Sequence, residues 1–387
     1  MKVLVFANKM PDLCGAFLHD IDLATELQKR GHQIVFLTIR IPKEGYNGGH
    51  YRGFRFLHYT AASTFLDSSE VWVCPHSPIL PDVRKINSRG YNRPIVATCH
   101  FDGNYSAITG NSKNAWNEML LFINTIMEAN YRKSIVPWPP QIRTTRSIRP
   151  LMHRNKIEIT EPFQGDAITL VNANQNKGVT QFLEIARKMP DRKFLGVLPY
   201  YGELFVPPSP GNVEWVPFSD DIRTVLKRTR VLLVPSFHES FGRIAVEAML
   251  NKIPVVYSLP SKMTTHPGGS SEGLHAWIEP VGLGVNRENI DEWMSAIVSL
   301  DDADTYRAKS EESREHVEAM DIFTEATRIA EMIETFTRQN PVVIRSSQQI
   351  QAVQNSPGPQ EVARPREPPE GRPGGFGFSN GRLRILR

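Results

Sequence analysis

The chain is poor in cysteine and has no long apolar run, and both absences exclude whole classes of protein. Of its 387 residues only three are cysteine, scattered at Cys14, Cys74 and Cys99. An odd, scattered set does not form a disulfide framework and is typical of a reducing compartment. With no CxxC or HxxxH spacing beside them, we expect no metal site and no metal cofactor. No stretch approaches the ~20 apolar residues of a transmembrane helix.

Two sequence signals are also missing near the beginning of the chain. The opening residues, MKVLVFANK, contain too short an apolar run, and no cleavage site, for a secretory signal. We therefore expect a cytoplasmic protein and leave peripheral contact with a membrane open. The dinucleotide fingerprint needs several spaced glycines after the first strand, whereas Gly15 stands alone there, so a nicotinamide cofactor is not expected.

Positive charge is concentrated at the C-terminal end. The whole chain carries a net charge of +4. Residues 341–387 contain seven arginines and three glutamates, which also gives +4. Residues 1–340, the body of the chain, are therefore neutral overall, which argues against a nucleic-acid partner. The tail, residues 339–387, is rich in proline, glycine and arginine. We expect it to be disordered because it cannot bury enough apolar area to offset its chain entropy.

A second basic stretch lies inside the body. Residues 132–156 contain seven lysines or arginines and no acidic residue. One interpretation is a surface for phosphates or anionic lipid, with Trp138 at the interface. The other, which we favour, is a solvated surface hairpin beside a domain boundary.

Short apolar runs alternate with amphipathic segments along most of the chain, in two successive series. In the first series we expect strands at 3–7, 34–38, 54–57, 71–73 and 95–98, a loop at 8–17 and a helix at 115–130. In the second we expect strands at 168–171, 193–198, 213–216, 231–234 and 255–257. Such alternation is typical of parallel sheets covered by helices.

The predicted fold class is therefore α/β, with two Rossmann-like domains at 1–160 and 161–320 whose parallel sheets face a central cleft. A helix at 321–338 follows, and its return to the first domain is left open.

The chemistry concentrates in residues 231–258, VLLVPSFHESFGRIAVEAMLNKIPVVYS, which read as strand, turn, helix, turn, strand. Glu239 lies in the loop after a buried strand, and Glu247 lies eight residues later inside the helix. Ligands of open α/β sheets bind at the carboxyl ends of the strands, and the free N–H groups of a helix N-terminus attract phosphate.

The surrounding residue types favour a nucleotide-sugar. Lys177, Arg243 and the free N–H groups suit a pyrophosphate, and Gly242 allows it to approach the backbone. Carboxylates would repel phosphate, so they are better suited to pairs of sugar hydroxyls. Two glutamates eight apart are nevertheless common, and alone Glu247 could be a solvated helix residue and Lys177 a surface lysine. Their joint placement at a strand end and a helix start favours a site.

The segment PSFHESFGRIAVEAMLNKIPVV resembles the Glu-x7-Glu segment of retaining glycosyltransferases of family 4 and their GT-B relatives. The resemblance continues in GHQIVFLT, ATCH and LVNANQNKGV and covers approximately residues 1–337. It implies a GT-B fold and transfer of a sugar, with retention, from a nucleotide-sugar to an unidentified sugar, lipid or small-molecule acceptor. In that mechanism the leaving phosphate accepts the proton of the acceptor, and no metal is required.

The resemblance also implies a role for individual residues. Glu247 resembles the ribose-binding glutamate, and Glu239 the residue that contacts hydroxyls of the transferred sugar. Lys177 resembles the lysine of the donor diphosphate, and His100 the histidine near the transferred sugar. The remaining expected site residues are the donor-binding Asn172, Ser240, Phe241, Gly242 and Arg243, and Gly15 of the first, acceptor or phosphate loop.

Two positions depart from the family pattern. Asn172 stands where the family has an arginine, and Arg243 could replace the lost cation. Lys252 stands where the family often has glycine. These departures favour one alternative, a non-catalytic nucleotide-sugar-binding protein. A GT-B nucleotide-sugar epimerase or phosphorylase is a second alternative that stays open. The sequence does not indicate the donor base, the donor sugar, the acceptor or the oligomeric state.

Overall fold

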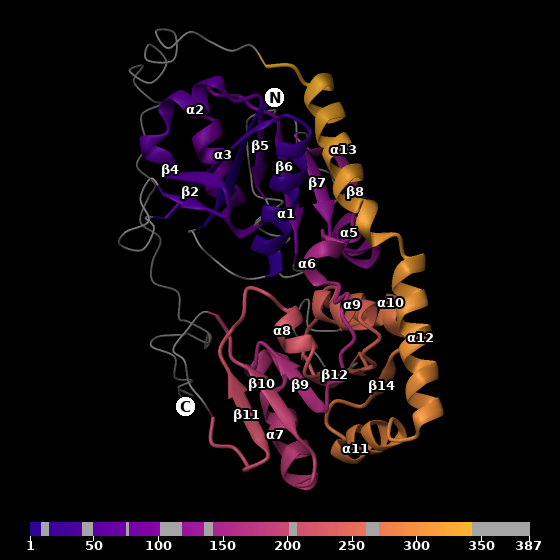
Figure 1. The fold of residues 1–387 in the computed structure, drawn as a ribbon. Coiled ribbons are helices and arrows are strands. Elements are labelled where there is room, and N and C mark those ends of the chain that lie inside the picture. Colours follow the sequence, from indigo (N-terminus) through magenta and orange to yellow (C-terminus); the bar gives the residue numbers. More distant parts are fainter. Residues whose placement is uncertain are drawn as a thin grey trace, which may run out of the picture.

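A computed structural model of the protein describes residues 1–8, 15–40, 49–74, 77–100, 118–134, 142–200, 207–260 and 271–342. These residues form two α/β domains, each built around one sheet (Figure 1). The α/β class and the two parallel-sheet domains expected from the sequence are thus confirmed. The tail predicted to be disordered lies, beyond residue 342, outside the described residues.

The first domain contains an eight-stranded sheet in the order β3-β4-β2-β1-β5-β6-β7-β8. Its strands are β1 (Lys2–Ala7), β2 (Gln33–Thr38), β3 (His50–Tyr51), β4 (Phe54–His58), β5 (Val71–Cys74), β6 (Ile95–Cys99), β7 (Glu118–Phe122) and β8 (Ile142–Ser147). All neighbours pair in parallel except β3 with β4. Its helices are α1 (Gly15–Lys29), α2 (Ser63–Ser68), α3 (Leu80–Asn87), α5 (Thr125–Ser134) and α6 (Arg154–Ile157). Strands β5 and β6 are buried throughout, as expected of continuous apolar runs covered on both faces.

The second domain contains a six-stranded parallel sheet in the order β11-β10-β9-β12-β13-β14. Its strands are β9 (Ala167–Val171), β10 (Phe194–Val197), β11 (Val213–Val216), β12 (Thr229–Val234), β13 (Val255–Ser258) and β14 (Leu283–Val285). The helices from here on are α7 (Val179–Lys188), α8 (Arg223–Leu226), α9 (Arg243–Leu250), α10 (Glu272–Ile278), α11 (Ile290–Ser299), α12 (Ala303–Ala319) and α13 (Glu325–Gln339). The strand order reverses between β9 and β12, and that switch point is where open α/β sheets bind their ligands.

The helix predicted at 115–130 is wrong in its first half. Strand β7 occupies Glu118–Phe122 and pairs with β6 and β8, and helix α5 begins only at Thr125. A continuous apolar run fits a buried strand as well as a helix face, so periodicity alone did not separate them. Glu118 is fully buried in an ion pair with Arg84 of α3, with Nη2 to Oε2 at 2.6 Å.

The surface hairpin predicted within 132–156 is also wrong. Strand β8 pairs in parallel with β7 and forms the edge of the first sheet. Three cations of the stretch, Arg132, Arg154 and Lys156, bond to acids outside it. Arg132 bonds to Glu128 at 2.6 Å and Lys156 to Asp22 at 2.8 Å. These partners explain how so basic a stretch lies against the body of the protein. Trp138 lies outside the described residues.

The last helix runs back from the second domain to the first. In Figure 1 α12 lies beside the second domain, whereas α13 runs along α1 of the first. Ile329 and Ile333 of α13 are fully buried. Arg30, at the end of α1, donates from Nε and Nη2 to the two carboxylate oxygens of Glu334, at 2.8 and 2.9 Å. The hydrogen bond from Arg30 is the main reason that the pKa of Glu334 is lowered to about 2.

Candidate functional site

A cavity of about 700 Å³ lies between the two domains, and loops at the carboxyl ends of both sheets line it. All ten residues predicted for the site line this cavity: Gly15, His100, Asn172, Lys177, Glu239, Ser240, Phe241, Gly242, Arg243 and Glu247. The structure therefore brings together residues spread over more than 230 positions of the chain, from position 15 to position 247.

The core of the site is the contact between the loops that follow β9 and β12. Gly178 has a φ of 80°, and a Cβ on it would lie 2.2 Å from the carbonyl oxygen of Pro235. Only glycine allows both the left-handed backbone and this close approach. The backbone N–H of Phe237 donates to the carbonyl oxygen of Asn176 at 2.8 Å. The two loops are thus held in contact at the switch point of the sheet.

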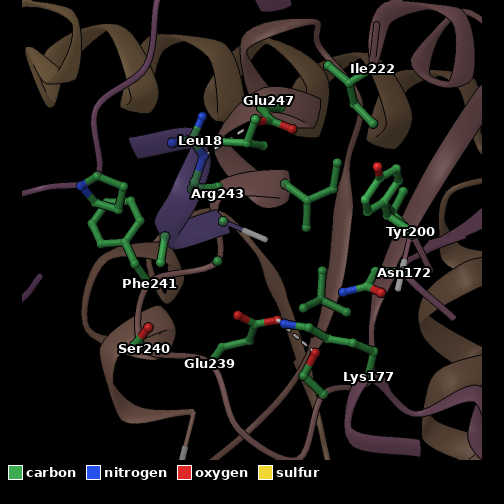
Figure 2. Close-up of a pocket in the computed structure, with 18 of the residues that line it drawn as sticks. Leu18, Asn172, Lys177, Tyr200, Ile222, Glu239, Ser240, Phe241, Arg243 and Glu247 are labelled. Atoms are coloured by element: carbon green, nitrogen blue, oxygen red, sulfur yellow. Dashed lines mark hydrogen bonds and ion pairs between the residues drawn. The ribbon is translucent and has the colours of Figure 1, made fainter. Parts of the chain in front are cut away.

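Across this contact Lys177 donates from Nζ to Oε1 of Glu239, and the two side chains point toward each other in Figure 2. The hydroxyl of Ser236 donates to the same oxygen at 2.9 Å. Glu239 is only 7% exposed, so its carboxylate is held in one orientation. Among the described residues Oε2 of Glu239 receives no hydrogen bond, and Lys177 has further N–H donors to offer. Oε2 of Glu239 can therefore accept a hydrogen bond from a hydroxyl, while Lys177 can donate to an anion.

Helix α9 begins beside this pair. Gly242 precedes it with a φ of 80°, and this glycine has no side chain with which to cap the first N–H groups of the helix. Phe241 stacks on Trp277 with ring centroids 5.4 Å apart, which anchors the segment before the helix. The carbonyl oxygen of Ser240 accepts from Nδ2 of Asn124 in the first domain at 2.7 Å. The uncapped N-terminus of α9 is therefore fixed in place and faces the cavity, as a diphosphate site requires.

Glu247 lies one turn inside α9. It is 9% exposed, and burial raises the pKa of its carboxyl, partly opposed by the nearby Arg243. The distance from Nε of Arg243 to Oε1 of Glu247 is 3.8 Å. The interpretation of Glu247 as a solvated helix residue is therefore wrong, since its carboxyl is buried at the edge of the cavity.

Arg243 does not face the side of the cavity where Asn172 lies. Its Nη1 donates to the carbonyl oxygen of Leu151 at 2.7 Å, and its Nη2 is 3.5 Å from Oδ2 of Asp22. Figure 2 shows Arg243 beside Glu247, away from Lys177. In this arrangement Arg243 connects the two domains. That Arg243 replaces the arginine which the family has at the position of Asn172 stays a prediction.

The two departures from the family pattern lie at left-handed backbone positions. Asn172 has a φ of 62° and lines the cavity. Asparagine tolerates this conformation better than most residues. Lys252 has a φ of 57° and follows α9, and its Nζ bonds to Glu311 at 2.6 Å. Lys252 is not part of the cavity lining. It therefore affects the end of α9 rather than the site, and a glycine would fit its backbone.

The first domain contributes Gly15 and His100. The loop expected to extend to residue 17 ends earlier, because Gly15 is already the first residue of α1. A Cβ on Gly15 would lie 3.8 Å from Cδ of Arg243, an ordinary contact that shows how closely α1 and α9 meet. His100 follows β6 and is 8% exposed, with its ring centroid 5.2 Å from that of His19.

Sequence reasoning missed the rim of the cavity. Tyr200 and Phe218, which follow β10 and β11, meet edge to face with centroids 5.3 Å apart, and Tyr200 is 43% exposed. Arg52 of the first domain bonds to Asp220 of the second at 3.0 Å beside them. An exposed aromatic ring suits a flat heterocycle. The signal that was overlooked is an aromatic residue after each of two successive strands.

Known proteins resemble this chain in sequence and in structure. Residues 209–266 match the family model described as "Glycosyl transferases group 1". A segment of 126 residues is 28% identical to the D-inositol 3-phosphate glycosyltransferase of Corynebacterium kroppenstedtii. That match covers 32% of this chain and 26% of the relative, so the chain spans about a quarter of its length.

Solved structures are similar over most of the chain. A sucrose-phosphate synthase from Thermosynechococcus elongatus matches with a TM-score of 0.63 at 16% identity, covering 88% of this chain and 99% of that one. WaaG, a glycosyltransferase involved in lipopolysaccharide biosynthesis, matches with a TM-score of 0.57 at 14% identity over 86% of this chain and 99% of its own. An Escherichia coli structure, described as trehalose-6-phosphate bound with UDP-2-fluoro glucose, matches with a TM-score of 0.58 at 12% identity. The match covers 87% of this chain and 99% of that chain.

These likenesses confirm that the two domains form the GT-B fold. Among the helices of the described residues, none combines the length and the apolar character needed to cross a membrane.

Proposed function

We propose that this chain is a glycosyltransferase of the GT-B, group 1 type that transfers a sugar from a nucleotide-sugar donor with retention at the anomeric carbon. The observation that carries the proposal is the grouping of three features in one cavity. These are the bonded pair of Lys177 and Glu239, the uncapped N-terminus of α9, and the buried carboxyl of Glu247. The match of residues 209–266 to the group 1 family model covers two of these features and supports the assignment.

Each feature has a role in the proposed reaction. The diphosphate lies at the N-terminus of α9, where free N–H groups and Lys177 offset its charge. The ribose hydroxyls donate to Glu247, and hydroxyls of the transferred sugar donate to Glu239. Because Lys177 and the N–H groups of α9 offset the charge of the leaving diphosphate, we propose that no metal is required.

For the bond changes we propose the mechanism that the family resemblance implies. The bond between the anomeric carbon and the diphosphate oxygen breaks, and its electron pair leaves with the diphosphate. The acceptor hydroxyl attacks the same face of the sugar, and its proton passes to the departing phosphate oxygen. Oε1 of Glu239 already accepts from Lys177 and Ser236, so we assign Glu239 to binding hydroxyls rather than to removing a proton.

The names of the similar proteins suggest which ligands to test first. The Escherichia coli structure holds a UDP-sugar, so UDP-sugars come first among the donors. The Corynebacterium relative is named for an inositol 3-phosphate and the cyanobacterial structure for a sucrose-phosphate, so phosphorylated polyols and sugars come first among the acceptors. We place the reaction in the cytoplasm, because a chain with three scattered cysteines suits a reducing compartment.

Thermal-shift screening against a panel of nucleotide-sugars tests the donor class. A ligand at about 100 times its dissociation constant adds ~2.7 kcal/mol to the free energy of unfolding, which raises Tm measurably. Transfer from the labelled donor to added acceptors, analysed for anomeric configuration, then tests the reaction. A product that forms equally without acceptor would identify an epimerase instead. Donor binding with neither transfer nor hydrolysis would identify a non-catalytic binding protein.

A further inference from the structure

A buried polar cluster lies behind the cavity in the first domain. His19 and Asp20, neighbours on α1, are 0% and 4% exposed. One nitrogen or oxygen atom of each lies within 4.8 Å of the other and of a ring nitrogen of His100. Within the described part of the chain, Nε2 of His19 and Oδ1 of Asp20 have no hydrogen-bond partner. Buried polar atoms are nearly always paired, so these two require an explanation.

A metal ion is the first candidate, because two histidines and an aspartate form a common ligand set. The ring of His19 argues against it. The backbone N–H of Leu151 donates to Nδ1 of His19 at 3.1 Å. A neutral imidazole has one lone pair, which this bond occupies, so Nε2 carries the hydrogen. A protonated Nε2 cannot bind a metal and can only donate.

The ionisation of the cluster agrees with this tautomer. Burial is the main cause that lowers the pKa of His19 well below its usual value, and His100 and Arg243 lower it further. Burial also raises the pKa of Asp20 well above its usual value, with Arg243 opposing and Asp22 adding to the effect. His19 therefore stays neutral, and its Nε2–H is a fixed donor inside the cluster.

Leu151 connects the ring of His19 to Arg243, which lines the cavity. Its N–H holds His19, while its carbonyl oxygen accepts from Nη1 of Arg243 at 2.7 Å. The rings of His19 and His100 meet edge to face, with centroids 5.2 Å apart and planes at 82°. We propose that His19, locked as the Nε2–H tautomer by Leu151, acts with Asp20 as a positioning residue that sets the orientation of the His100 ring at the cavity wall. This proposal rests on the proposed function and on the family resemblance, which implies that His100 lies near the transferred sugar.

Two substitutions of His19 separate positioning from simple structural support. In His19→Asn the side-chain oxygen can replace Nδ1 and accept from Leu151, but the Nε2–H donor is lost. In His19→Gln the amide nitrogen can replace that donor, but the acceptor for Leu151 is lost. If His19 positions His100, His19→Asn lowers kcat about 10- to 100-fold at unchanged donor KM, because a small misplacement near the reacting centre is costly. His19→Gln then retains more activity.

The opposite ranking would overturn the proposal. If His19 serves only to accept from Leu151, His19→Asn has wild-type kcat and His19→Gln is the damaged variant. The matched control is His50→Asn, the same change at an exposed histidine in β3, which should leave Tm and kcat unchanged.

A spectroscopic measurement tests the arrangement without any assay. In the full chain with 15N-labelled histidine, long-range 1H–15N spectra should show His19 as the neutral Nε2–H tautomer from about pH 6 to 8. The His100 signals should shift in His19→Asn and return in His19→Gln. An Nδ1–H tautomer, or a stoichiometric metal that perturbs both rings, would reject the proposal. If the spectra behave as expected but no sugar is transferred, the proposed function fails while His19 remains the residue that orients His100.

Discussion

At the level of single residues, the cavity holds its charged groups in contact with one another. Lys177 bonds to Glu239, and Arg243 lies between Glu247 and Asp22. A bound diphosphate must therefore compete with carboxylates that the cations already contact. Net binding depends on the difference between the two sets of contacts rather than on the number of cations. The sequence indicated four of these residues, but not that they contact one another.

Removing the charge of either member of the Lys177–Glu239 pair should abolish most of the transfer while the fold survives. We expect Glu239→Gln and Lys177→Met each to lower kcat by about 10²- to 10³-fold, the usual loss when one preorganised transition-state contact is removed. Steady-state transfer assays and Tm together measure the effect. Asp166→Asn, which breaks the exposed Lys193–Asp166 pair, is the matched control and should behave as wild type. Wild-type turnover in either site variant would contradict the assignment.

Glu247→Gln should weaken donor binding and change the pH dependence of stability. With the ribose contact reduced, we expect the donor KM to rise about tenfold at nearly unchanged kcat. Burial raises the pKa of Glu247, so the native state binds this proton more tightly than the unfolded state does, and wild-type stability falls as pH rises through that raised value. The variant should therefore equal or exceed wild-type Tm at pH 7, with the difference vanishing near pH 4. A Tm difference between the variant and wild type that grows toward low pH would contradict the raised pKa of Glu247.

At the level of elements, the site depends on turns that place two loops in contact. The β9 and β12 loops touch where Gly178 meets Pro235, and α9 begins only because Gly242 adopts a left-handed backbone. Sequence patterns predicted these strands and the helix well, because their apolar runs and glycines are local signals. They failed at β7, whose apolar run fits two structures, and at β8, which is parallel only because β7 lies beside it.

Gly178→Ala tests the contact between the two loops. A Cβ there would lie 2.2 Å from a backbone oxygen in addition to the strain of a positive φ, so we expect a loss of about 3 kcal/mol in the free energy of unfolding and loss of activity. Gly31→Ala is the matched control. Gly31 has a φ of 85°, but no atom lies within 4 Å of the place that a Cβ would take, so only about 1 kcal/mol should be lost. Denaturant unfolding measures both. Equal losses would show that the close approach is unimportant.

At the level of the whole molecule, α13 connects the end of the second domain to the first. Glu334 on α13 accepts hydrogen bonds from Arg30 and lies 2.8 Å from Nε2 of His32, so this contact spans about 300 positions of sequence. Because α1 also lines the cavity, holding α13 against it supports the wall that carries Gly15.

Glu334→Gln should destabilise the protein in a pH-dependent way. The pKa of Glu334 is lowered to about 2, so its stabilising effect is fully present above its unfolded pKa, near 4.5, and is lost as pH falls toward 2. Because solvent screens this contact, we expect a loss of at most about 1 kcal/mol at pH 7 that shrinks as the pH is lowered below about 4, measured by Tm across the range. Glu331→Gln, on the same helix but 59% exposed and 3.8 Å from Arg30, should change little. Equal effects of the two variants at pH 7 would argue against the Arg30–Glu334 contact.

Apolar runs and glycines act through local structure, so the sequence alone was enough to predict the α/β class and the two sheets. The family resemblance then indicated ten of the residues that line the cavity. The tertiary structure decided which of those residues contact one another. It tied Arg243 to the first domain, buried Glu247, and placed His19 and Asp20 behind His100. Burial and charge pairing arise only when distant segments meet, and no local pattern records them.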